Sequence, residues 1–127
     1  MQVESTIDRG KSLTVQTVRG EVTAQEILDA IAAFYAGEPT RNILWDFSEA
    51  GPGSLTSDEI RSIAKATARG ARQRVGGRTA FVFSSTFAYA MGRMFDQWVS
   101  ASGAPVEYVS FRDRESALAW LEGAPAS

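Results

Sequence analysis

Three short apolar segments, each followed by an amphipathic helical pattern, limit most strongly the folds open to this chain. The segments cover residues 43–47, 79–84 and 106–111. Their nearly continuous apolar character is typical of strands buried on both faces of a sheet. Parallel strands need long crossover connections, which are usually helices. The alternation therefore predicts an α/β fold in which a mostly parallel sheet is layered with helices.

The first twenty residues follow a different pattern, in which apolar and polar side chains alternate. This alternation predicts an N-terminal hairpin of two strands with a turn at residues 9–11. Thr23 and Glu26 form a capping-box pattern at the start of a helix that ends at Gly37. Further helices are expected from 54–57 to about 74, over about 86–101 and over about 113–122. The chain is then a single domain, 1–127, with the order β-β-α-β-α-β-α-β-α and a mixed sheet.

Each of the two middle helices carries an apolar stripe that we expect to face the sheet. The stripe of the second helix consists of Ile60, Ile63, Ala64, Thr67, Ala71 and Val75. The third helix presents Phe87, Met91, Met94 and Trp98 on one face. Packing in the core is the simplest interpretation of this face, and a dimer contact or an apolar ligand is the alternative.

The chain contains neither histidine nor cysteine. Thiolate nucleophiles, thiolate metal sites and a serine–histidine triad are therefore excluded. We expect no metal ion, no cofactor and no enzymatic activity. No signal peptide or transmembrane segment is predicted, and the absence of cysteine agrees with a cytoplasmic location.

Polar side chains cluster where the predicted parallel strands end. Because ligands of open α/β sheets lie beyond the carboxyl ends of the strands, these side chains form the first candidate site. Hydroxyls that open a helix are often only N-caps, so an anion site is the alternative to simple capping. The candidates at the strand ends are Asp46, Ser48, Ser84, Ser85 and Arg112, and Tyr89 and Arg93 are further candidates on the third helix.

Two further features are compatible with function. Asp46 and Glu49 could act together as a carboxylate pair in acid–base chemistry. Between residues 61 and 78 the sequence has six basic and no acidic residues, although the chain as a whole carries a net charge of −2. Helical spacing places four of these basic residues on one face of the helix: Arg61, Lys65, Arg69 and Arg72. This basic face is either a solvated surface or a docking site for an anionic partner or membrane. The sequence pI of about 5.1 argues against nucleic-acid binding.

Several segments resemble the SpoIIAA-like family of bacterial proteins, which are related to the STAS domains of anti-sigma-factor antagonists. The segments are Trp45-Asp46-Phe47-Ser48, Ala80 to Ser85, Ala88 to Phe95, and Phe111-Arg112-Asp113 with Ala117 to Leu121. The resemblance implies a STAS-like fold. Because this branch is also likened to CRAL-TRIO lipid-binding domains, it further implies that an amphipathic ligand can be considered.

The family's Asp-Ser-Ser-Gly phosphorylation signature is absent, and residues 51–58 stand in its place. Ser54, Thr56 and Ser57 occupy a comparable position at a helix start, where phosphate would be electrostatically favoured. The leading hypothesis is a regulatory module that binds a protein partner or a small anionic or amphipathic ligand. The alternatives are a lipid carrier that uses Arg93 or Arg112, and an enzyme that uses Asp46 and Glu49. A homodimer is left open.

Overall fold

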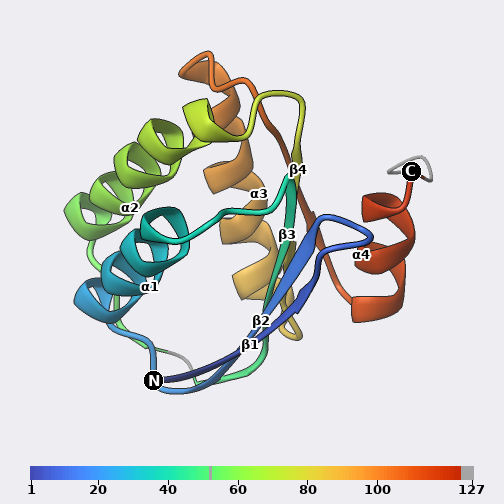
Figure 1. Ribbon diagram of the computed structural model, residues 1–127. Helices are drawn as coiled ribbons and strands as arrows, with labels where there is room; N and C mark the ends of the chain where they lie inside the picture. The colour runs from blue at the N-terminus through green and yellow to red at the C-terminus, as the bar shows by residue number, and fades with distance from the viewer. Residues whose placement is uncertain (52, 124–127) are drawn as a thin grey trace.

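The computed structural model describes residues 1–51 and 53–123 and contains the predicted elements in the predicted order (Figure 1). The strands are β1 (Gln2–Asp8), β2 (Leu13–Gly20), β3 (Asn42–Ala50), β4 (Arg78–Val82) and β5 (Glu107–Phe111). The helices are α1 (Ala24–Ala36), α2 (Ser57–Gly70), α3 (Thr86–Ala101) and α4 (Arg114–Leu121), with a 3₁₀ turn at Ala71–Gln73.

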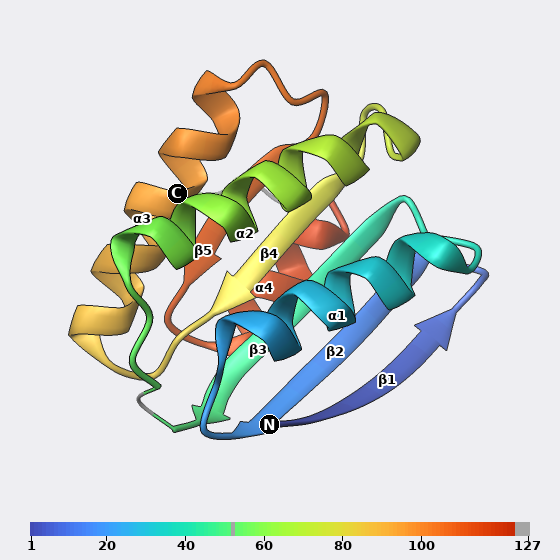
Figure 2. The ribbon, with the colours of Figure 1, turned by 90° about the vertical axis from the view of Figure 1, so that its left-hand side faces the viewer.

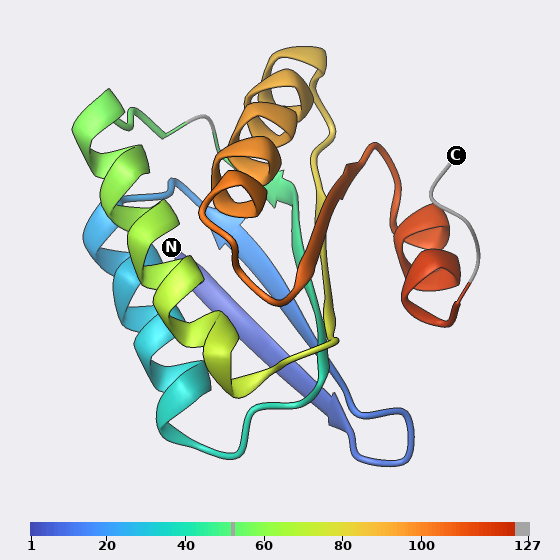
Figure 3. The ribbon, with the colours of Figure 1, turned by 90° about the horizontal axis from the view of Figure 1, so that it is seen from above.

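The five strands form one sheet in the order β1-β2-β3-β4-β5. β1 is antiparallel to β2, and all other neighbours are parallel. Figure 3 shows that α1, α2 and α3 cover one face of the sheet and that α4 lies on the other. The expected mixed, mostly parallel sheet with an N-terminal hairpin and four helices is confirmed. No helix in the described ranges is long and apolar enough to cross a bilayer.

Two apolar layers hold the helices to the sheet. The larger layer, beneath α1 to α3, includes Val18, Ile43, Trp45, Phe81 and Val99. The smaller layer joins Leu44, Ala80 and Val82 of the sheet to Trp120 and Leu121 of α4. α4 is short and packs mainly against β3, β4 and β5.

The predicted orientation of α3 is wrong. Phe87, Met94 and Trp98 are 77%, 45% and 39% exposed, so the stripe points away from the sheet. The buried side of α3 consists of Gly92, Asp96 and Val99. These shorter side chains allow the helix to approach the aromatic rings on the sheet. The prediction was wrong because it assigned the most apolar face of the helix to the core, whereas the buried face contains a glycine and an aspartate.

Gly92 shows how close that approach is. A methyl group at this position would lie 2.3 Å from Cε2 of Phe83 and 2.7 Å from Oγ of Ser110. We therefore expect Gly92→Ala to lower the free energy of unfolding by about 1–3 kcal/mol, although alanine favours helix. Chemical denaturation measures this, with Ser100→Ala on the exposed side of α3 as the control. An unchanged or increased stability of Gly92→Ala would contradict the described packing.

Other boundaries differ from the predictions in smaller ways. α2 ends at Gly70 rather than near residue 74, and Val75, expected in the apolar stripe, is 70% exposed. Thr23 caps α1 as expected. The Glu26 carboxylate, however, pairs with the N-terminal amine and accepts from the Thr23 hydroxyl, instead of closing a capping box. A complete capping box forms at Thr56, the N-cap of α2. β3 continues beyond the apolar segment 43–47 through Glu49 and Ala50.

Candidate functional site

Polar side chains from three strand ends and α4 meet at the edge of the sheet where β3, β4 and β5 end. We call this group the rim and define it as Asp46, Ser48, Ser84, Thr86, Arg112 and Arg114. Parallel pairing of β3 with β4 and of β4 with β5 brings these ends to one edge, as the sequence predicts.

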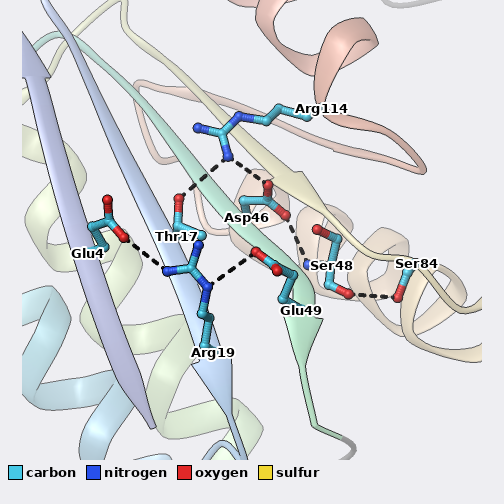
Figure 4. A network of polar contacts seen from close by, with 8 residues as sticks. All are labelled: Glu4, Thr17, Arg19, Asp46, Ser48, Glu49, Ser84 and Arg114. Carbon is cyan, nitrogen blue, oxygen red and sulfur yellow. Dashed lines mark hydrogen bonds and ion pairs between the residues drawn. The ribbon is translucent and has the colours of Figure 1, made fainter.

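Asp46 is the buried anchor of the rim (Figure 4). Its side chain is 4% exposed, and its Oδ2 lies 3.2 Å from Nη1 of Arg114. The other oxygen, Oδ1, accepts a hydrogen bond of 2.9 Å from the backbone N–H of Ser48. Nη1 of Arg114 also lies 3.5 Å from the Thr17 hydroxyl. Both oxygens of the carboxylate are therefore occupied, and Arg114 ties the start of α4 to the end of β3.

A second set of contacts joins β4 to its neighbours. The Ser84 hydroxyl donates to the Ser48 carbonyl at 3.1 Å. Arg112 donates from Nη2 to the Ser84 carbonyl at 3.1 Å and from Nη1 to the Thr86 hydroxyl at 3.4 Å. The guanidinium of Arg112 also lies 5.7 Å from the centre of the Tyr89 ring. These contacts fix the loops after β4 and β5 relative to each other.

The two carboxylates considered for acid–base chemistry have different partners. Glu49 lies 3.3 Å from Nε of Arg19, whose Nη1 binds Glu4 at 2.9 Å. Asp46 binds Arg114 instead. Figure 4 shows the two carboxylates in separate sets of contacts, each with its own guanidinium group. Because each carboxylate is bound by a different guanidinium group, the two do not act as a pair, and the carboxylate-enzyme hypothesis gains no support.

The hydroxyl residues at the helix starts serve mainly as caps. Ser85 accepts from the N–H of Ala88 at 3.0 Å, and Thr56 accepts from the N–H of Glu59 at 3.1 Å. Ser54 and Ser57 are exposed beside this cap. Asp113 caps α4, and hydrogen bonds from Ser116 lower the pKa of its carboxyl group. Capping, the simpler of the two interpretations, accounts for Ser85, Thr56 and Asp113. Residue 52, within the stretch 51–58 considered from the sequence, lies outside the described residues.

The remaining candidate residues lie away from the rim. Arg93 is exposed on α3, close enough to Asp96 to act on its carboxylate. The four residues of the basic face are all exposed along α2 and the 3₁₀ turn: Arg61, Lys65, Arg69 and Arg72. They belong to a different surface from the rim.

The space between α3 and the sheet is occupied by aromatic rings. Phe81 contacts Phe95 edge-on with ring centres 5.6 Å apart, and Phe47 stacks on Phe83 at 5.5 Å. Arg112 lies at the edge of this region over Tyr89, with its guanidinium bound to backbone and hydroxyl oxygens. This filling gives no support to a lipid chain held between α3 and the sheet.

Arg114, Thr17 and Arg19 were not among the residues predicted from the sequence. Arg114 follows the cap Asp113 in the sequence, and a basic residue at a helix start is unfavourable for the helix dipole. That local mismatch was the available signal for a role outside the helix. Thr17 and Arg19 come from β2, whose pairing with β3 had to be known before they could be placed beside Asp46 and Glu49. Phe87 was assigned to the core, although it follows the rim directly and is largely exposed.

This sheet order, with three helices on one face and one on the other, is the STAS-type α/β fold. The chain is similar to the anti-sigma factor antagonist SpoIIAA in its unphosphorylated form, with a TM-score of 0.59 and 14% sequence identity. The similarity covers 97% of this chain and 100% of that structure. The fold implied by the sequence resemblance is thereby confirmed. No protein-family model matches the sequence, and no curated protein matches it either.

Proposed function

We propose that this chain is a regulatory STAS-like module that works without catalysis, by docking a protein partner on the rim. Its fold is shared with a protein described as an anti-sigma factor antagonist, a role performed through other proteins. The rim contains no imidazole or thiol, and its carboxylate Asp46 is already paired with Arg114. Such a surface is suited to recognition rather than to proton transfer. A cytoplasmic partner is the natural choice for a chain without cysteine.

The observation that carries this proposal is Phe87, which is 77% exposed and directly follows the rim residue Thr86. Burying a large apolar side chain contributes about 1.5–3 kcal/mol. Aromatic anchors surrounded by polar groups are typical of the residues that dominate binding energy in protein interfaces. Around Phe87, the contacts of Arg112 with Ser84 and Thr86 hold the loops in place, so little order has to be gained on binding.

Capture from a lysate of the native host, with the immobilised chain as bait, tests this proposal. We expect at least one protein to be retained by the unmodified chain and by Ile7→Ser. We expect its affinity for Phe87→Ser to fall by about tenfold to a hundredfold, as measured with the purified protein. Ile7 is the matched control because it is 51% exposed on β1, the strand at the opposite edge of the sheet from β5.

Circular dichroism and denaturation of Phe87→Ser should show an intact fold, because the replaced side chain is exposed. Retention of no protein, or equal affinity of both variants for every retained protein, would contradict docking through Phe87.

A further inference from the structure

A second surface lies on the outer side of the helical layer, further from the rim than Phe87 in the first turn of α3. α2 and α3 lie side by side over the same face of the sheet (Figure 2). The buried residues of α2 include Ile63 and Gly70, whereas its three basic side chains are exposed on the opposite side of the helix, and Arg72 is exposed in the 3₁₀ turn that follows. On α3, Met94 and Trp98 lie opposite the buried Gly92 and Val99. Both sets of side chains therefore point away from the sheet, on the same side of the molecule.

The basic and apolar side chains also lie at similar levels along the two helices. α2 and α3 both start at the rim edge, because each follows a parallel strand and precedes the next. Lys65 lies eight residues after the start of α2, and Met94 lies eight residues after the start of α3. Arg69 and Trp98 each lie twelve residues after their helix starts. At 1.5 Å per residue, each pair lies about 12 or 18 Å from the rim. We call the surface formed by Arg61, Lys65, Arg69, Arg72, Met94 and Trp98 the outer patch.

The outer patch is positively charged within an acidic chain. No ion pair found in residues 1–51 and 53–123 involves any of its four basic side chains. α3 has one acidic residue, Asp96, and that residue is buried. The acidic residues of α2, Asp58 and Glu59, lie in its first turn at the rim end. A cationic surface that also exposes a tryptophan and a methionine combines the two features of interfacial membrane helices.

We propose that the outer patch binds the surface of an anionic lipid membrane. Membrane lipids supply negative charge and accept projecting Trp98 and Met94 side chains without needing a matching pocket. A second copy of this chain fits less well, because two-fold pairing of the patch would bring like charges together. Each basic residue near an anionic surface strengthens binding about fivefold, or about 1 kcal/mol. The four together give a strong dependence on lipid charge and on salt.

Sedimentation with lipid vesicles tests this proposal. We expect the unmodified chain to bind vesicles of equal parts phosphatidylglycerol and phosphatidylcholine at low salt, and to bind pure phosphatidylcholine much more weakly. The double variant Lys65→Glu/Arg69→Glu should bind the anionic vesicles at least about thirtyfold more weakly, because two attractive charges are lost. The control Arg9→Glu/Lys11→Glu changes the net charge equally in the β1–β2 hairpin and should keep its binding.

Tryptophan fluorescence gives a second readout. Trp45 and Trp120 are 7% and 2% exposed, so a blue shift on adding anionic vesicles reports Trp98. Trp98→Phe should remove the shift while keeping most of the binding. Absence of vesicle binding, equal binding to neutral vesicles, or equal loss in the hairpin control would overturn the proposal. Dimer formation or capture of an acidic protein through the patch, without vesicle binding, would also overturn it. None of these results affects the proposed role of Phe87.

Discussion

Replacing Arg74 by alanine is expected to lower the free energy of unfolding by about 3–5 kcal/mol. Arg74 is 4% exposed, and its guanidinium has no carboxylate partner among the described residues. It is held instead by six hydrogen bonds of 2.9 to 3.2 Å to oxygens of Tyr35, Thr40, Arg41, Arg78 and Thr79.

The position of these acceptors explains the size of the expected loss. Arg74 connects the end of the 3₁₀ turn to the loop before β3 and to the start of β4, at the edge opposite the rim. Without the guanidinium, the buried carbonyl oxygen of Thr40 and the partly buried carbonyl oxygens of Arg41 and Arg78 lose a donor. Each such loss at a buried acceptor costs about 1–3 kcal/mol. Because small domains are stabilised by about 5–15 kcal/mol in total, a large share of the stability depends on this side chain.

Urea denaturation measures the effect. Arg72→Ala is the matched control, since Arg72 is exposed two residues earlier and should change stability by less than about 0.5 kcal/mol. Arg74→Lys should fall between them, because an ammonium group cannot reproduce the planar fork of donors. Equal stabilities of Arg74→Ala and Arg72→Ala would show that the six hydrogen bonds of Arg74 do not stabilise the fold.

Replacing Asp96 by asparagine is expected to raise stability at neutral pH, the opposite of most core substitutions. Asp96 is 8% exposed on the sheet side of α3, and its Oδ1 has no hydrogen-bond partner among the described residues. Burial raises the pKa of this carboxyl group from 3.8 to about 6, although Ser110 and Arg93 act in the opposite direction. Burial thus disfavours the charged form that predominates at pH 7.

The direction of the pH dependence follows from this shift. A folded-state pKa above the unfolded value favours folding while Asp96 is protonated, below about pH 3.8. That contribution is lost as the pH rises through about 6. At 1.36 kcal/mol per pKa unit, the full loss is about 3 kcal/mol. An asparagine side chain carries no charge, so Asp96→Asn should be more stable by about 2–3 kcal/mol at pH 7.5 and by little at pH 4.

Denaturation curves at several pH values test this expectation. The control Asp29→Asn changes an exposed carboxylate on α1 and should leave both the stability and its pH dependence nearly unchanged. A decrease in stability of Asp96→Asn at pH 7.5 would mean that the buried carboxylate has a stabilising partner and would refute the assignment.

The strands and helices could be predicted because their signals are local. Alternation marks the hairpin, continuous apolar runs mark β3 to β5, and Thr56, Ser85 and Asp113 cap the helices that follow. The orientation of α3 could not be predicted in this way. Its buried side holds Gly92 and Asp96, which are selected by close approach to Phe83 and Ser110 rather than by hydrophobicity.

The candidate site was predictable in position but not in its pairing. Strand ends of a parallel sheet must meet at one edge, so Asp46, Ser48 and Ser84 could be grouped from the sequence. The partner of Asp46 is Arg114, which lies 68 residues further along the chain. The contacts of Arg74 could not be predicted from the sequence either. Its acceptors are mostly backbone oxygens, which every residue has, so no acidic partner in the sequence indicates where the side chain lies.

Chemical-shift mapping of the isotope-labelled chain with its captured protein partner tests the central claim most directly. We expect the largest shift changes in the rim and its neighbourhood, at residues 46–48, 84–89 and 112–114, with Phe87 at the centre. The turn of the β1–β2 hairpin, at residues 9–12, should show no change. Changes confined to the hairpin or to α1, with the rim unaffected, would contradict the claim that this chain acts by docking a partner at the ends of its parallel strands.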